Sequence, residues 1–322
     1  MKPLELAPNQ IRRFYRGGRR IAAFRGLPET DDDAPEDWVA SMTHARGEPE
    51  VGPSRVDGRL LGEILAADPQ AFFEPEHLER FGPEPTVLLK LLDAGERLPL
   101  HFHPDGAFAQ RHLDEPRGKT EAWIFLDADP GAAVHVGFAR DISADEVETM
   151  VAAEDVAALV GTMNRLPVSA GAAIFVPAGV PHVIGEGILL LELQEPSDLS
   201  VLLEWRGIVD ERDAFLGLER ETALSALGRS RTDVAALQAA RLPVLFPQEA
   251  DTFFRAERVG GGAEIEPSFG VLVVTSGEGM LETERGDQLW LQRGSTVLVP
   301  FAAGVTRVSG SCEAIRCRPP AP

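Results

Sequence analysis

Cysteine is nearly absent from the 322-residue chain, which has only Cys312 and Cys317, both close to its C-terminal end. Two cysteines cannot build a disulfide framework, so we expect two buried thiols in a reducing cytoplasm, with one late disulfide as the alternative. No apolar run reaches the roughly 20 residues that a membrane helix needs. The opening stretch, MKPLELAPNQIRRFYRG, also lacks the apolar core and cleavage site of a signal peptide. We therefore expect a cytoplasmic protein with no membrane partner.

Basic residues are scarce as well: 31 Lys and Arg stand against 51 Asp and Glu, which gives a formal net charge of −20. The field of such a chain repels nucleic acid and anionic surfaces at long range, so we expect no nucleic-acid partner. It also disfavours phosphorylated small molecules unless local cations offset it. The sequence has no phosphate-binding glycine loop, nucleophile elbow or Cys-x-x-Cys pair, which makes nucleotide-binding and hydrolase functions poor candidates.

Short apolar runs bounded by turn residues dominate from residue 86 to about residue 205. They include TVLLKLLDAG, EAWIFLDA, AAVHVGF, AAIFVPAG and GILLLELQ. Runs of this length and spacing are typical of antiparallel strands in a sandwich or barrel. The sequence therefore predicts a mainly β fold.

Two segments with helical character interrupt the strands. Residues 143–165 open with a capping box, Ser143 to Glu146, and continue with apolar residues at helical spacing. Residues 210–240 predict two or three short helices, broken at Gly228. Neither segment carries a motif with chemical function, so we predict that both are structural elements of a small helical insert.

An internal repeat links two distant strands. GAAIFVPAGVPH and GSTVLVPFAAGV share a glycine, four further residues and then Val-Pro, which places His182 opposite Val305. The repeat predicts two related β-barrels, of which only the first keeps a histidine. The predicted division is a metal-binding barrel with an N-terminal extension and both helical segments (1–240), followed by a degenerate barrel without metal ligands (241–322).

Two histidines stand one residue apart in the stretch LPLHFHPD, at His101 and His103. Alternate residues of a strand face the same side, so both imidazoles can reach one divalent metal. Glu121 heads another predicted strand, and His182 follows a turn in PAGVPHVIG. Nitrogen and carboxylate ligands suit a metal of borderline hardness. We predict these four residues as the ligand set, three histidines and one glutamate, of a cupin metal centre.

The same parts of the chain resemble the class I mannose-6-phosphate isomerases, a family of zinc-dependent cupins. The matching stretches occur in family order and include EDWVASM, LLKLLDAGERLPLHFHPD, GKTEAWIFLDADPG, GAAIFVPAGVPHVIG and LLLELQEPSDLS. The resemblance implies a double cupin, which is two jelly-roll β-barrels with a small helical insert. It implies an aldose–ketose isomerase acting on a sugar or sugar phosphate, mannose 6-phosphate and fructose 6-phosphate in the family. It also implies a divalent metal, zinc first, with iron, manganese or nickel as alternatives.

Carried over residue by residue, the resemblance places family ligands on His103, Glu121 and His182. It places the substrate-contacting lysine of the family on Lys119, in the stretch GKTEAW. A cation beside a metal can hold an anionic or hydroxyl-rich ligand. The alternative for a lysine in a Gly-Lys-Thr turn is plain exposure to solvent.

The chain departs from the family at three positions of the predicted site. His101 stands where the family has a glutamine ligand, Pro99 where it has a serine, and Leu202 where it has an arginine held to be catalytic. An arginine at such a site would stabilise a phosphate or a developing oxyanion. Its loss argues against mannose 6-phosphate as the substrate and favours an altered or unphosphorylated sugar.

Strand parity offers a replacement for the missing arginine. Glu204 and Arg206 lie two and four residues after Leu202 and would share its face in an extended strand. Our hypothesis is that Glu204 acts as the catalytic base and that Arg206 lies at the rim of the barrel. The alternative is that both are ordinary residues at a strand end.

Two other functions are compatible with the same ligand pattern. Three histidines and one glutamate also hold iron or manganese in cupin oxygenases, which would consume oxygen. A sugar-binding or regulatory cupin that has lost its catalytic arginine would bind its ligand without turnover.

Overall fold

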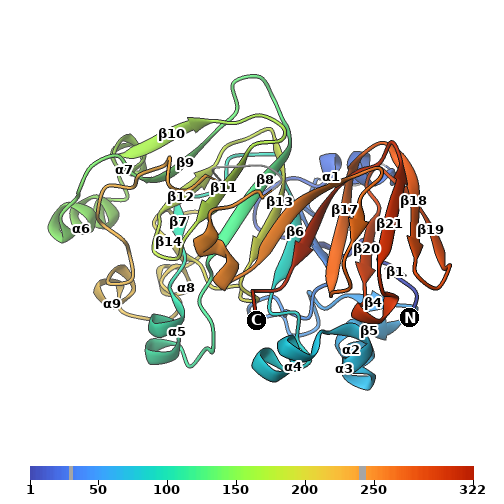
Figure 1. Cartoon of the computed structure of the whole chain (residues 1–322). Helices are drawn as coiled ribbons and strands as arrows, with labels where there is room; N and C mark the ends of the chain where they lie inside the picture. The colour runs from blue at the N-terminus through green and yellow to red at the C-terminus, as the bar shows by residue number, and fades with distance from the viewer. Residues whose placement is uncertain (29–31, 239–243) are drawn as a thin grey trace.

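The computed structural model describes residues 1–28, 32–238 and 244–322, which form two β bodies lying side by side (Figure 1). The strands of the first body are β2 (Gln10–Ile11), β3 (Glu36–Val39), β6 (Leu88–Ala94), β7 (His101–Phe102), β8 (Glu121–Ala128), β9 (Ala133–Phe138), β10 (Met163–Pro167), β11 (Ala173–Val176), β12 (His182–Ile184), β13 (Ile188–Gln194) and β14 (Val201–Leu202). Those of the second body are β1 (Leu4–Glu5), β15 (Arg255–Gly260), β16 (Glu264–Ile265), β17 (Gly270–Ser276), β18 (Glu278–Thr283), β19 (Gln288–Gln292), β20 (Thr296–Val299), β21 (Thr306–Gly310) and β22 (Glu313–Arg318). A short hairpin, β4 (Arg55–Val56) and β5 (Arg59–Leu60), stands apart from both.

Each body consists of two antiparallel sheets. In the first body the orders are β11-β8-β13-β6-β3-β2 and β10-β9-β12-β7-β14. In the second they are β1-β20-β17-β22-β15 and β16-β21-β18-β19. The predicted mainly β fold with two bodies is confirmed. The predicted boundary between residues 240 and 241 lies outside the described residues, and the N-terminal strand β1 pairs with β20 of the second body.

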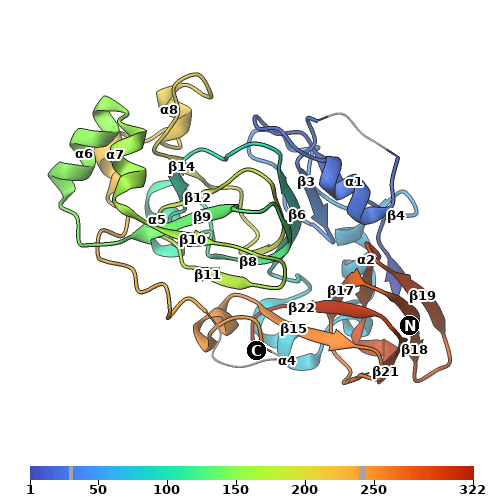
Figure 2. The ribbon, with the colours of Figure 1, turned by 90° about the horizontal axis from the view of Figure 1, so that it is seen from above.

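The helices are short and lie around the sheets. They are α1 (Arg19–Arg25), α2 (Leu61–Ala67), α3 (Pro69–Phe72), α4 (Pro75–Phe81), α5 (Gly106–His112), α6 (Ala144–Ala153), α7 (Val156–Gly161), α8 (Glu211–Ala214) and α9 (Arg220–Leu224), with 3-10 turns η1 (Gln248–Thr252) and η2 (Phe301–Ala303). Figure 2 shows α6, α7 and α8 at the end of the first body that is far from the second. No helix in the described ranges is long and apolar enough to cross a bilayer.

The predicted helical segments are shorter in the structure than in the sequence analysis. Segment 143–165 forms α6 and α7 as expected, with the Ser143 hydroxyl accepting a hydrogen bond from the backbone N–H of Glu146. The helix ends at Gly161, however, and the last three predicted residues begin strand β10. Of segment 210–240, the described residues form only α8 and α9.

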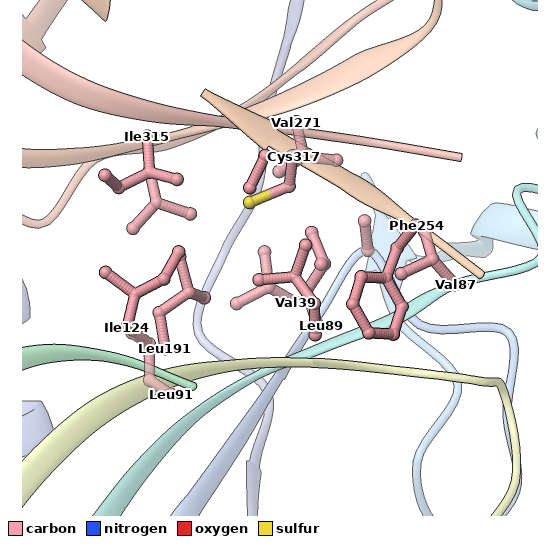
Figure 3. Close-up of a cluster of buried hydrophobic side chains, with 14 of the residues drawn as sticks. Val39, Val87, Leu89, Leu91, Ile124, Leu191, Phe254, Val271, Ile315 and Cys317 are labelled. Atoms are coloured by element: carbon pink, nitrogen blue, oxygen red, sulfur yellow. The ribbon is translucent and has the colours of Figure 1, made fainter. Parts of the chain in front are cut away.

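The position of strand β13 in its sheet explains why its sequence, ILLLELQ, is apolar without strict alternation. It lies inside the six-stranded sheet and is buried along its whole length. Successive side chains of a strand point to opposite faces of the sheet. Leu191 therefore lies in a core shared with the second body, and Leu190 lies in the core inside the first body. Figure 3 shows Leu191 on the side of its sheet that faces Ile315 and Cys317. Both cysteines are buried free thiols, as predicted.

A buried ion pair connects the two bodies. The Nε atom of Arg25, at the end of α1, donates to the Asp37 carboxylate over 2.7 Å, and the two side chains are only 4% and 0% exposed. The same guanidinium donates from Nη1 to the Thr296 hydroxyl in β20 over 2.7 Å. This single side chain therefore joins β3 of the first body to β20 of the second.

We expect the Asp37→Asn variant to lose about 3–5 kcal/mol of stability, because it leaves the Arg25 charge buried without its counter-ion. The lowered midpoint of urea unfolding would measure the loss. The matched control is Glu264→Gln, since Glu264 pairs with Arg307 at the surface, where the side chains are 52% and 69% exposed. That variant should lose no more than about 1 kcal/mol. Equal midpoints for the two variants would contradict a stabilising role for the buried pair.

Candidate metal centre

Three histidine side chains converge inside the first body. His101 in β7 and His182 in β12 are direct partners across antiparallel strands, and their Nε2 atoms are 2.9 Å apart. His103 follows β7 by one residue, and its ring centroid lies 5.1 Å from that of His101 and 4.9 Å from that of His182. One nitrogen of each ring lies within 4.8 Å of the others. The predicted pairing of His101 and His103 on one face is therefore confirmed in the geometry.

The backbone fixes the protonation of all three rings. Each Nδ1 atom lies within hydrogen-bonding distance of a backbone carbonyl oxygen: His101 of Pro99 (2.8 Å), His103 of Leu199 (2.7 Å) and His182 of Val180 (2.9 Å). A carbonyl can only accept, so each Nδ1 carries the proton and each Nε2 presents a lone pair. Two such lone pairs face each other over 2.9 Å between His101 and His182. A cation between them would remove that repulsion, so the donor set fits a divalent metal.

Burial keeps the rings neutral. Loss of hydration is the main cause that lowers the pKa of His103 to about 3, with the Lys119 charge adding to it. Burial also lowers the pKa of His182 to about 3 and that of His101 well below its ordinary value. Neutral imidazole is the form that binds metal, so no proton has to be displaced near neutral pH.

Glu121 completes the cluster from the first position of β8. Its carboxylate oxygens lie 3.0 Å from Nε2 of His103 and 3.3 Å from Nε2 of His182. The Trp123 indole donates to Oε1 over 2.9 Å and fixes the carboxylate. Oε2 is buried and lies among the Lys119 ammonium group and the His103 ring. Burial alone would raise the pKa of Glu121, but Lys119 and His103 hold it well below its ordinary value, so the oxygen is available to a metal.

Lys119 is part of the cluster and is not exposed to solvent. Its Nζ atom lies 2.9 Å from Nε2 of His103 and 3.1 Å from Oε2 of Glu121, and the residue is buried. Gly118 permits this approach, because a Cβ atom there would lie 2.5 Å from the carbonyl carbon of Asp105. The Gly-Lys-Thr stretch therefore brings an ammonium group to the histidines.

A cavity of about 960 Å³ opens above the cluster, and its floor carries charges that the sequence analysis missed. A charged row runs across it through successive ion-pair contacts: Arg13 to Glu36 (3.4 Å), Glu36 to Lys90 (3.6 Å), Lys90 to Glu192 (3.9 Å) and Glu192 to Lys119 (3.8 Å). Lys90 and Glu192 are single charged residues inside the apolar runs LLKLL and ILLLELQ. That interruption is the sequence signal that could have identified them, because a charge in a buried strand must have a partner.

Glu192 is a carboxyl group of the cavity floor that binds its proton more tightly than an ordinary glutamate. It is buried in β13 between the two lysines of the charged row. Burial, together with the Glu121 charge, raises the pKa of Glu192 to about 8, although both lysines act in the opposite direction. Glu192 therefore offers a carboxyl group that can carry a proton near neutral pH.

The hypothesis of Glu204 as a base inside the barrel, with Arg206 at its rim, does not agree with the structure. The Glu204 carboxylate accepts a hydrogen bond from the backbone N–H of Leu100 over 3.0 Å and pairs with Arg97 over 2.5 Å. Arg206 is 64% exposed and pairs with Glu154 over 2.9 Å. Neither side chain lines the cavity. Strand β14 ends at Leu202, so the two-residue alternation does not extend to these positions.

The positions at which this chain differs from the family it resembles lie at the metal site. Leu202 pairs with His101 across β14 and β7, is buried, and lines the cavity. Pro99 also lines the cavity, and its carbonyl oxygen contacts Nδ1 of His101. An apolar wall therefore stands beside His101 where the family has an arginine.

The two antiparallel β bodies and the buried cluster define a protein of the cupin fold with a divalent-metal site. No family model matches the sequence. The chain is 29% identical over 325 residues to a mannose-6-phosphate isomerase of Streptococcus mutans, covering 98% of this chain and 97% of that protein. The mannose 6-phosphate isomerase structure from Bacillus subtilis matches with a TM-score of 0.78 at 25% identity, over 99% of this chain and 100% of that one.

A second similar structure, a mannose 6-phosphate isomerase bound with zinc and yttrium, has a TM-score of 0.74 at 15% identity and covers all of both chains. At that identity it shows the fold alone. The sequence relatives and the Bacillus subtilis structure make this chain a relative of the mannose-6-phosphate isomerases over nearly its full length.

Proposed function

We propose that this protein is a metal-dependent aldose–ketose isomerase that interconverts mannose 6-phosphate and fructose 6-phosphate, with zinc as the metal. The observation that carries the proposal is the convergence of three neutral imidazoles, one carboxylate and Lys119 at the base of a cavity large enough for a sugar. The names of the full-length relatives support the substrate pair. The proposal includes a cytoplasmic location, where free thiols such as these stay reduced.

Four residues would hold the metal: His101, His103, Glu121 and His182. When bound, a divalent metal supplies Lewis acidity that polarises the carbonyl and hydroxyl oxygens of an open-chain sugar. The protein contributes the fixed geometry, since backbone carbonyls orient the imidazoles and the Trp123 indole orients the carboxylate. Burial of His103, Glu121 and His182 keeps water away from these ligand side chains.

Glu192 is the group that we propose moves the proton between carbons. It lines the cavity, and the four proposed metal ligands do not include it. As a carboxylate it takes the proton from C2 of the aldose, and as a carboxylic acid it returns the proton to C1. A hydroxyl proton has to pass from O2 to O1 in the same conversion. The Lys119 ammonium is the hydrogen-bond donor beside that end of the cavity.

The phosphate of the substrate has support in the cavity in spite of the leucine at position 202. Arginines line the cavity at four positions: Arg12, Arg13, Arg46 and Arg212. They provide the local cations that a chain with a net charge of −20 needs in order to hold an anion. The loss of one arginine therefore leaves others within the same cavity.

Proton NMR in deuterated water tests the proposed function. Protein of measured zinc content is given mannose 6-phosphate, fructose 6-phosphate and the free sugars, and metal-depleted protein serves as the control. We expect exchange of the C2 proton of mannose 6-phosphate and formation of fructose 6-phosphate only with metal. Full metal occupancy without exchange would overturn the proposal. Oxygen consumption would then point to an oxygenase, and binding without exchange to a sugar-binding cupin.

A further inference from the structure

Arg13 reaches the cavity from the segment that follows β2. It lines the same cavity as His101, Lys119 and Glu121, and its side chain is 19% exposed. Its guanidinium is fixed by Asp198, which accepts hydrogen bonds from Nη2 over 3.0 Å and from Nη1 over 3.2 Å. This planar, two-point contact orients the guanidinium with little freedom left to lose when a ligand binds.

The guanidinium of Arg13 keeps donors for a further partner. An arginine has five N–H groups, and the contact with Asp198 uses two of them. Nε is buried and makes no hydrogen bond within the described residues, although Oε1 of Glu36 lies 3.4 Å away. Glu36 itself is occupied elsewhere: it accepts hydrogen bonds from the Tyr15 hydroxyl and the Trp38 indole, and it pairs with Lys90. Asp198 and Glu36 therefore flank the Arg13 charge, while N–H groups of its guanidinium remain without an acceptor within the described residues.

Arg13 stands at one end of the charged row, and the histidines stand at the other. The row connects them through Glu36, Lys90, Glu192 and Lys119, and Nζ of Lys119 lies 2.9 Å from Nε2 of His103. An open-chain hexose phosphate has its reacting carbons at one end and its phosphate at the other. A sugar whose C1 and C2 lie at the histidines would extend along the row and bring its phosphate toward Arg13.

We propose that Arg13 is the specificity-determining residue that binds the phosphate group of the sugar, an inference that rests on the proposed isomerase function. Leu202, beside His101, is apolar and cannot bind an anion. The remaining arginines of the cavity are competitors for this role. Among them, Arg12 is 79% exposed and pairs with Asp33, so it is the least suited to hold a phosphate away from water.

The test compares phosphorylated and free sugars on the zinc-loaded Arg13→Gln variant. We expect kcat/KM for mannose 6-phosphate to fall about 100-fold, because a charged hydrogen-bonding partner of the phosphate is lost. Zinc content and the C2 exchange rate of unphosphorylated mannose should match the wild type. The matched control is Arg19→Gln, which removes the same charge from the same segment at a 67% exposed side chain that does not line the cavity. It should leave both sugars unaffected.

Three results would overturn the inference. An equal loss with both sugars would show that Arg13 acts only through folding or through its contact with Asp198. A selective loss in Arg46→Gln or Arg212→Gln, with Arg13→Gln like the wild type, would move the phosphate site to those arginines. Wild-type activity toward mannose 6-phosphate in Arg13→Gln would show that the phosphate does not contact it.

A binding measurement separates this inference from the proposed function. Line broadening in the phosphorus NMR spectrum of fructose 6-phosphate reports phosphate binding whether or not turnover occurs. Binding by the wild type and its loss in Arg13→Gln would support Arg13 even if no isomerisation were found, whereas equal binding by both would overturn it. If the glutamine variant does not fold, Arg13→Lys keeps the charge without the planar contact. It should show a smaller loss, confined to phosphorylated sugars.

Discussion

The His182→Ala variant is expected to lose its metal and to turn over mannose 6-phosphate at least about 10³-fold more slowly, since several kcal/mol of metal assistance correspond to that factor. His182 is fully buried at the start of β12. Its Nε2 atom lies within hydrogen-bonding distance of Nε2 of His101 and close to the Glu121 carboxylate. Alanine removes one of the three imidazole lone pairs of the cluster. Metal content of the purified variant and its C2 exchange rate are the two measurements.

His135→Ala is the matched control for that variant. His135 lies on β9 and pairs with Val183 in β12, so the substitution removes the same side chain from the neighbouring strand. It does not belong to the histidine cluster. We expect wild-type metal content and turnover. Full metal occupancy in His182→Ala would contradict the assignment of His182 as a ligand.

The histidine cluster shows what a local sequence pattern can predict. The alternation in LPLHFHPD was enough to place His101 and His103 on one face, because strand geometry depends only on neighbouring residues. Glu121 and His182 were proposed from their strand and turn contexts and gained support from the family resemblance, since they come from strands that meet only after folding. The same applies to the fold, where short apolar runs predicted strands but not which strands share a sheet.

The charged row shows where local patterns are insufficient. Lys90 and Glu192 face each other on paired strands that are separated by about a hundred residues in the sequence. Arg13 comes from an N-terminal segment that no strand pattern connects to the cavity. At Glu204 the local pattern predicted too much, because the side-chain alternation of a strand was assumed beyond the last residue of β14. In all of these cases, tertiary contacts determine whether the side chain reaches the cavity.

Glu192→Gln is expected to lower kcat by about 10²- to 10⁴-fold, the range for loss of a general acid–base group. Glutamine keeps the size of the side chain and its place between Lys90 and Lys119, but it cannot take up and return a proton. Because the four proposed metal ligands are untouched, metal content should remain that of the wild type. A lower kcat with unchanged metal content would separate proton transfer from metal binding.

The informative comparison is Glu204→Gln, because it makes the same chemical change at the carboxylate that strand parity favoured. Glu204 is engaged by Arg97 and by the backbone of Leu100 and does not line the cavity. We therefore expect this variant to keep most of its turnover, with any loss appearing in thermal stability. If Glu204→Gln lost catalysis and Glu192→Gln kept it, the base would belong to the strand end after all. The proton would then have to reach the sugar from outside the charged row.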